Sequence, residues 1–193
     1  MHPGRSASVR VQSFLASILS LLLLALILQT PARAAPPEAD PGAENVSVAV
    51  LCDHRFGPAV ADSMTVRTSV FDAQLTWMQQ NGVHIIPLRT LVDYLAGTGP
   101  APAPHSVVIT VDDGHRTVFS EMLPVIERHD VPVTLFIYPS AISNASYALT
   151  WDQLRTLRAN KNIDVQSHTY WHPNFDRERK RLSPAEFVAF SEN

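Results

Sequence analysis

Two short segments of the chain carry the residue types that bind metal ions and move protons. Asp112 and Asp113 directly follow the apolar run 107–111, and His168 and His172 follow the run 163–166. Two imidazoles and one carboxylate form a facial set of metal ligands that leaves positions open for water and substrate. The second carboxylate is then free to act as a base. Together these residues predict a metal-assisted hydrolase.

Each pair also has a plainer interpretation when it is taken alone. Asp followed by Gly114 is ordinary turn chemistry, so the acidic pair also fits a simple strand-to-helix turn. The histidines also fit two surface residues beside Tyr170 and Trp171. The combination favours a site, because the carboxyl ends of parallel strands lie along one edge of a sheet.

The spacing within each pair predicts how the side chains are presented. Neighbouring residues at a strand end point to opposite sides, so we expect one carboxylate in the ligand plane and the other beside it. One of them would bind the metal and the other would polarise the attacking water. His168 and His172 are four residues apart, and one helical turn would place both rings on one face.

His54 is a third candidate, because it follows the first predicted strand and should reach the same edge of the sheet. An imidazole there could protonate a leaving amine. The alternative is a loop histidine that is hydrogen-bonded to Asp53. His115 is interpreted as a residue at the rim of the site and not as a ligand. Cys52, the single cysteine of the chain, is predicted to be a small buried hydrophobic residue.

These residues are placed by alternating strands and helices. Apolar, β-branched runs predict five strands, at 46–51, 83–86, 107–111, 133–138 and 163–166. Helical spacing of apolar residues predicts helices over 70–78, 88–95, 118–128 and 150–160. A further helix begins at Ser183, where Ser-Pro-Ala-Glu forms a capping box with proline at the first helical position.

The alternation predicts an α/β fold with a parallel sheet covered by helices. About five strands are too few for a closed barrel, which takes about eight. The sequence ends at Asn193, shortly after the capping box at Ser183. We therefore expect an incomplete fold.

The amino-terminal residues predict export. Arg5 and Arg10 precede a 15-residue apolar segment, and Ala-Arg-Ala follows at 32–34, which is typical of a signal peptide over residues 1–35. An uncleaved anchor is the alternative, although the segment is shorter than the roughly 20 residues that span a bilayer. Residues 36–45 form a Pro-rich linker, and residues 46–193 form the domain. After cleavage no transmembrane span is expected, and we predict a periplasmic or extracellular protein.

The charge of the exported part argues against one class of partner. From residue 36 onward, 12 Lys and Arg stand against 18 Asp and Glu, a net charge of −6. This balance predicts no nucleic-acid binding. The sequence does not indicate an oligomeric state.

Three motifs resemble those of the polysaccharide deacetylase family, also called the NodB-homology or carbohydrate esterase 4 family. The segment 110–114, T-V-D-D-G, resembles the family's T-F-D-D-G, and 168–172, H-T-Y-W-H, matches H-[ST]-x-x-H. The segment 131–136, V-P-V-T-L-F, is similar to the P-A-T-F-F strand between these motifs. The resemblance runs from about residue 46 to the end. It is closest to exported enzymes that deacetylate poly-N-acetylglucosamine.

The resemblance implies a role for each candidate residue. Asp112 would be the general base, and Asp113, His168 and His172 would bind a divalent metal, with Zn²⁺ favoured. His54 would be the candidate acid. The family implies a distorted (β/α) barrel, here incomplete, and hydrolysis of N-acetyl groups from an aminosugar polymer with release of acetate.

Two other functions stay open at this point. The later family motifs have no counterpart before residue 193, so the chain could be a truncated, inactive, carbohydrate-binding or vestigial protein. The same residues could also act on a small amide or imide. Tyr170 and Trp171 near the site would suit the face of a sugar ring, which favours a carbohydrate.

Overall fold

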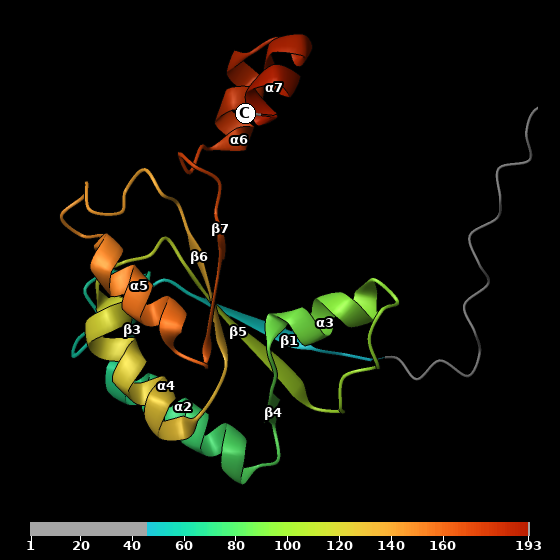
Figure 1. The fold of residues 1–193 in the computed structure, drawn as a ribbon, viewed down its shortest axis with the longest axis vertical. Helices are drawn as coiled ribbons and strands as arrows, with labels where there is room; N and C mark the ends of the chain where they lie inside the picture. Colours follow the sequence, from blue (N-terminus) through green and yellow to red (C-terminus); the bar gives the residue numbers. More distant parts are fainter. Residues whose placement is uncertain (1–45, 193) are drawn as a thin grey trace, which may run out of the picture. The chain divides into compact units, whose positions relative to one another are not determined.

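The computed structural model describes residues 46–192, which contain a five-stranded parallel sheet. Its strands are β1 (Ala49–Asp53), β4 (His84–Ile85), β5 (Ser106–Asp112), β6 (Val133–Ile137) and β7 (Ile163–Ser167). The strand order is β1-β5-β6-β7, and β4 pairs with the amino-terminal end of β5 (Figure 1). The predicted α/β class with about five parallel strands is confirmed. The predicted signal peptide and linker lie outside the described residues.

Six α-helices follow or connect the strands in this part of the chain. They are α2 (Thr68–Gln80), α3 (Leu88–Leu95), α4 (Leu123–His129), α5 (Trp151–Ala159), α6 (Phe175–Arg181) and α7 (Pro184–Ser191). Figure 1 shows α2, α4 and α5 grouped along one side of the sheet. Within residues 46–192, no helix is long and apolar enough to cross a bilayer.

The two faces of the sheet differ in polarity. Ile109 and Val111 of β5 and Leu135 of β6 point into the hydrophobic core that α2, α4 and α5 complete. The alternate residues Thr110 and Thr134 point to the opposite face. This alternation gives β5 and β6 burial on both faces, and it brings Asp112 to the carboxyl end of a rigid central strand.

Local signals set several helix ends as predicted. The Thr150 side chain accepts a hydrogen bond from the backbone of Gln153, whose own side chain returns to Thr150, so α5 begins with a full capping box. Ser183 and Glu186 form the same box at α7 with Pro184 at its start. Such boxes satisfy backbone N–H groups that the first helical turn leaves unpaired.

The predicted helix over 118–128 divides into two parts. Residues Val118–Met122 form a π-helical turn, in which the Leu123 N–H donates to the carbonyl of Val118, and α4 follows. Pro124 lies in the first turn of α4, where its missing N–H costs no helical hydrogen bond. The proline therefore marks the boundary between the two parts.

The first strand, predicted over 46–51, begins and ends later in the chain, and it is exposed although its apolar sequence indicates burial. Strand β1 begins at Ala49, and Val50 and Leu51 are 49% and 37% exposed. Among the described strands it pairs only with β5, and a cavity of about 240 Å³ separates it from Phe71 and Leu75 of α2. The predicted burial of Cys52 on this strand is also wrong, since the residue is exposed.

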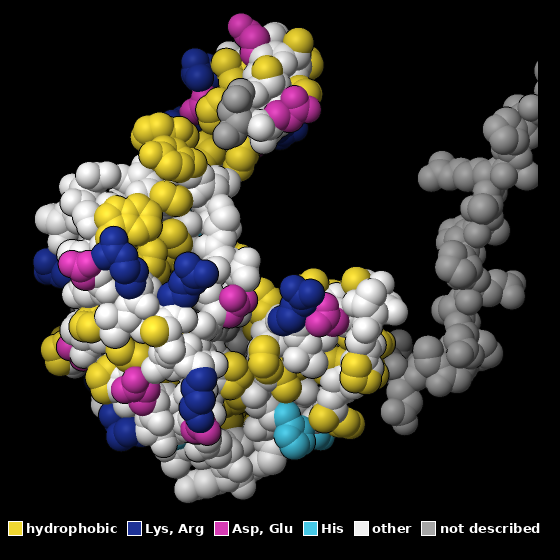
Figure 2. Space-filling model, in the orientation of Figure 1, with side chains coloured by type: hydrophobic (Ala, Val, Ile, Leu, Met, Phe, Trp, Pro, Cys, Tyr) yellow, Lys and Arg dark blue, Asp and Glu magenta, His cyan; other side chains and the backbone are white. Residues whose placement is uncertain are grey.

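Some elements were not predicted at all. Strands β2 (Arg55–Gly57) and β3 (Thr65–Arg67) form a separate two-stranded parallel sheet just after β1. Helix α6 packs on α7 through Phe175, whose ring lies 6.2 Å from Phe187 and 6.1 Å from Phe190. Hydrophobic side chains are visible on the surface of this helical pair in Figure 2.

Candidate metal centre and active site

The acidic pair lies in a left-handed turn at the end of β5. Asp113 has a φ of 71° and Gly114 a φ of 67°. At Gly114 a Cβ atom would lie only 3.1 Å from Cγ2 of Ile137, so the turn packs closely on β6. The left-handed backbone at Asp113 turns its carboxylate toward the same histidine that Asp112 approaches. Asp113 lies with the two imidazoles and Asp112 lies beside them, which is the arrangement expected of one carboxylate in the ligand plane and the other beside it.

The two histidines lie in an irregular loop after β7, not on the predicted helical turn. Thr169 and His172 both have left-handed backbones, with φ values of 65° and 51°. The Thr169 hydroxyl accepts a hydrogen bond from the His172 backbone N–H at 3.0 Å. This tight turn brings the two imidazole rings to 4.7 Å between centroids, so the loop achieves what a helix was expected to do.

Strand β6 and the residue that follows it supply two aromatic rings beside the histidines, which the sequence analysis did not predict. The ring of Phe136 lies 6.4 Å from that of His168, and the ring of Tyr138 lies 5.0 Å from that of His172. The Tyr138 hydroxyl is hydrogen-bonded to the Tyr147 hydroxyl, and burial with this bond raises the pKa of Tyr138. The sequence did contain a signal for these rings, namely the aromatic residue that ends the run Phe-Ile-Tyr at 136–138.

Asp113, His168 and His172 form a compact set of possible metal ligands. Asp113 Oδ1 lies 3.4 Å from His172 Nε2 and 3.8 Å from His168 Nε2. All three ligand atoms lie within 4.8 Å of one another. Ligands around a tetrahedral zinc ion are separated by about 3.3–3.6 Å, given zinc–nitrogen and zinc–oxygen bonds of about 2.0–2.2 Å.

One atom of this set is unusual because it is buried without a partner. Asp113 Oδ1 has no hydrogen bond, although the native fold normally pairs a buried polar atom. A buried carboxylate oxygen without a donor is costly, and a cation between it and the two imidazoles would remove that cost. The donor set thus fits a divalent metal ion.

Asp112 and His54 lie beside this set. Asp112 Oδ2 is 3.8 Å from His168 Nε2, which puts the second carboxylate next to the predicted ligands. His54, with Cys52, has a ligand atom within 4.8 Å of an Asp112 oxygen. The structure therefore brings all five predicted site residues to one end of the sheet. Next to His54, burial raises the pKa of the Asp53 carboxyl, and the charge of His54 opposes this shift.

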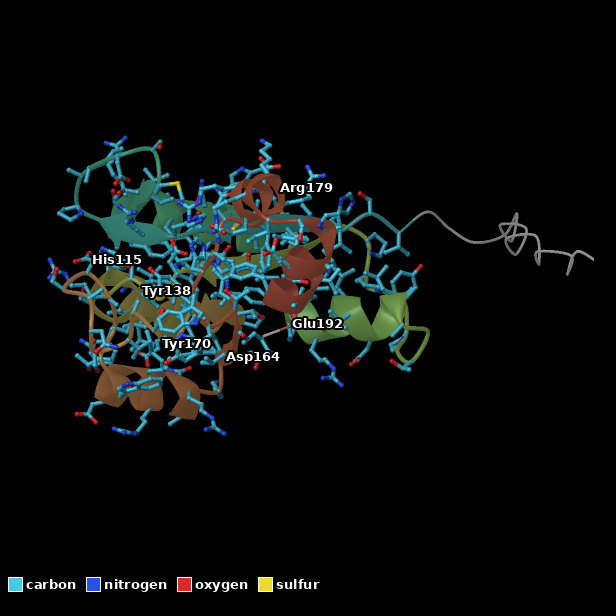
Figure 3. The ribbon with its side chains drawn as sticks, turned by 90° about the horizontal axis from the view of Figure 1, so that it is seen from above. His115, Tyr138, Asp164, Tyr170, Arg179 and Glu192 are labelled. Atoms are coloured by element: carbon cyan, nitrogen blue, oxygen red, sulfur yellow. The ribbon has the colours of Figure 1, made fainter. Side chains whose placement is uncertain are left out.

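Strand β2, which follows β1, is tied to the loop after β5 by one hydroxyl. Thr117 Oγ1 accepts a hydrogen bond from the Phe56 N–H at 3.0 Å and lies 2.9 Å from His115 Nδ1. His115 stacks on Tyr147 at 6.1 Å, and burial lowers its pKa. In Figure 3 His115 and Tyr138 lie in the same part of the view. His115 is a neighbour of the site, as predicted.

Tyr170 and Trp171 are both exposed and lie in the histidine loop. Their side chains are 53% and 73% exposed, and their rings meet edge to face at 4.6 Å. The Tyr170 carbonyl accepts a hydrogen bond from the Ser140 N–H, which joins this loop to the segment after β6. Large exposed rings next to a polar site can stack on a ligand.

Known proteins share this sequence pattern and fold. Residues 99–191 match the polysaccharide deacetylase family model. The poly-β-1,6-N-acetyl-D-glucosamine N-deacetylase of Escherichia coli K12 is 24% identical over 186 residues. That match covers 84% of this chain but 27% of the relative, so the chain spans about a quarter of that protein's length.

Solved structures share the fold over most of the described residues. IcaB from Ammonifex degensii superposes with a TM-score of 0.58 at 27% identity and covers 64% of this chain and 53% of its own. The Streptococcus pyogenes deacetylase PplD, in complex with acetate, gives a TM-score of 0.61 at 20% identity, with 72% and 61% covered. Residues 99–191 thus resemble the polysaccharide deacetylase family in sequence, and the described residues share the fold of solved deacetylases.

Proposed function

We propose that this protein is an N-deacetylase that hydrolyses N-acetyl groups on an aminosugar polysaccharide. Asp113, His168 and His172 would hold a divalent metal ion, which we take to be Zn²⁺ from its preference for imidazole and carboxylate ligands. The observation that supports this most directly is the buried Asp113 Oδ1, which faces both imidazoles without a hydrogen-bond donor.

The remaining two residues move protons. A metal ion held by these residues would supply Lewis acidity toward the acetyl carbonyl and toward water. Asp112, beside His168, accepts the proton of the water that attacks the carbonyl carbon. His54, which has a ring nitrogen within 4.8 Å of an Asp112 oxygen, donates a proton to the sugar nitrogen as the carbon–nitrogen bond breaks. The products are acetate and a free amine.

The substrate class and the location rest on different evidence. The name of the Escherichia coli relative supports a poly-β-1,6-N-acetylglucosamine-like polymer, and the exposed rings of Tyr170 and Trp171 suit a sugar face. The acetate in the Streptococcus pyogenes structure agrees with acetate as the product. Export to the periplasm or beyond is proposed from the signal-like pattern of residues 1–35.

The test is acetate release by the 193-residue chain loaded with one equivalent of Zn²⁺. The substrates are short oligomers of β-1,6-linked and of β-1,4-linked N-acetylglucosamine, and acetate is measured directly. Asp112→Asn should lower the rate by about 10²–10⁴-fold, because positioned general bases contribute that much. The matched control is Asp164→Asn, the same chemical change at the start of β7, where Asp164 accepts a hydrogen bond from Gln166.

The possible outcomes separate the alternatives. Acetate release that persists in Asp112→Asn would show that the base is misassigned. A zinc-loaded chain that binds oligomers but releases no acetate would support the inactive carbohydrate-binding protein. Acetate release from a small amide but from neither oligomer would support the alternative of an enzyme that acts on a small amide or imide.

A further inference from the structure

A second group of metal-ligating side chains adjoins the first. Cys52, at the end of β1, His54, just after it, and Asp112, at the end of β5, have ligand atoms within 4.8 Å of one another. The Cys52 Sγ lies 3.5 Å from Asp112 Oδ2. The role proposed above for Asp112 and His54 makes no use of the thiol. The chemistry of this trio therefore needs its own account.

The geometry of the trio suits a single ion. Zinc–sulfur bonds of about 2.3 Å and zinc–oxygen bonds of about 2.0–2.2 Å place tetrahedral ligands about 3.5 Å apart. This is the distance that already separates Cys52 Sγ from Asp112 Oδ2. Pairing of β1 with β5 sets it, because Cys52 stands opposite Thr110, two residues before Asp112. Little movement is needed for an ion to enter.

The donors also suit a particular class of ion. A thiolate with an imidazole and a carboxylate selects zinc and similar thiophilic ions over Mg²⁺ or Ca²⁺, which prefer oxygen. Cys52 is exposed, so an ion can reach it from solvent. Binding replaces the proton of the thiol with the metal ion and releases that proton to solvent, with no change in oxidation state.

We propose that Cys52, His54 and Asp112 form a second, weaker zinc site that is separate from the Asp113, His168 and His172 site. It fills after the first site, because a second dication near the first is repelled while Asp112 Oδ2 lies only 3.8 Å from His168 Nε2. An ion there occupies both the carboxylate and the imidazole that the proposed reaction uses. Excess zinc should therefore inhibit the enzyme, a consequence that rests on the proposed function.

Metal binding is tested without reference to activity. The metal-free 193-residue chain is titrated with Zn²⁺ by calorimetry and with Co²⁺ by absorption. Wild type should bind two ions in sequence. Cys52→Ser should keep the first step and weaken the second by at least about 100-fold, because even the loss of a residue that only orients a ligand costs about 10–100-fold. His84→Gln, an exposed histidine on β4, is the control for nonspecific binding and should keep both steps.

Cobalt gives a signature that belongs to the thiolate alone. Cys52 is the only cysteine, so a near-ultraviolet sulfur-to-cobalt absorption band reports its coordination directly. The band should appear during the second step. In wild type, bound zinc should also protect Cys52 from alkylation by iodoacetamide only beyond the first equivalent. This measurement needs no variant, so it holds even if Cys52→Ser folds poorly.

Three results would overturn the second site. One is a single binding step in wild type, and another is a second step that Cys52→Ser leaves intact. The third is a sulfur–cobalt band during the first step, which would place Cys52 in the first ion's shell. If both steps appear but no acetate is released at any zinc concentration, the second site stands and the proposed deacetylase function fails.

Discussion

The ends of β5 and β1 carry site residues side by side, yet the two strands are held very differently. They run parallel in register, with Leu51 opposite Ile109. Ile109 is 1% exposed, whereas Leu51 is 37% exposed. The carboxylate that faces the two imidazoles follows the strand buried on both faces, whereas the thiol lies near the end of the exposed strand and His54 follows it. Two strand ends at the same edge of the sheet can therefore differ in rigidity, because the packing of each strand decides it.

The largest expected difference between the two strand ends is in metal affinity. Asp113→Ala should weaken the first zinc-binding step by at least about 100-fold, because it removes a ligand outright. His54→Gln on the β1 side should leave that step unchanged. Calorimetric titration of both variants checks this. Equal weakening by the two changes would mean that the strand ends act as one ligand set.

A smaller difference is expected in stability. Ile109→Ala should cost about 2–5 kcal/mol of unfolding free energy, because it leaves a cavity in the packed core. Leu51→Ala, its partner across the ladder, should cost about 1 kcal/mol or less, since that side chain already borders a cavity and solvent. Urea unfolding measures both values. Similar costs would show that β1 is as tightly packed as β5.

The smallest expected effect links the two strand ends through charge. Desolvation, followed by the negative charge of Asp112 and its hydrogen bond, raises the pKa of the Cys52 thiol above its usual value. At pH 8 the thiolate fraction is therefore low and alkylation is slow. Asp112→Asn removes the charge, so the pKa falls and metal-free alkylation should quicken by less than about tenfold. A rate unaffected by the change would mean that the two groups do not interact in solution.

The sequence was most informative where local chemistry decides the structure. The apolar run ending at Asp112 predicted β5, and the capping box at Ser183 predicted the start of α7. The residues of the candidate site were also found, because aspartates and histidines at strand ends are visible in the sequence itself. Helix α3 lies over the predicted residues Leu88–Leu95.

What the sequence did not predict depends on neighbours that are distant along the chain. The exposure of β1 follows from having one paired strand and little cover by α2, which an apolar run does not report. Strands of three residues, such as β2, are too short for a pattern. The left-handed backbones at Asp113 and His172 belong to non-glycine residues, so residue type gave no sign of the turns that bring the site together.

The hydroxyl of Thr117 joins the backbone just after His54 to the segment that follows Asp112. A change at this position would shift the distance between two reactive groups while leaving both groups chemically intact. In an evolving lineage or a redesigned enzyme, such a residue offers a way to adapt the site to a bulkier or slimmer molecule. Variation at Thr117 would then reveal changes in substrate size that the reactive residues themselves never show.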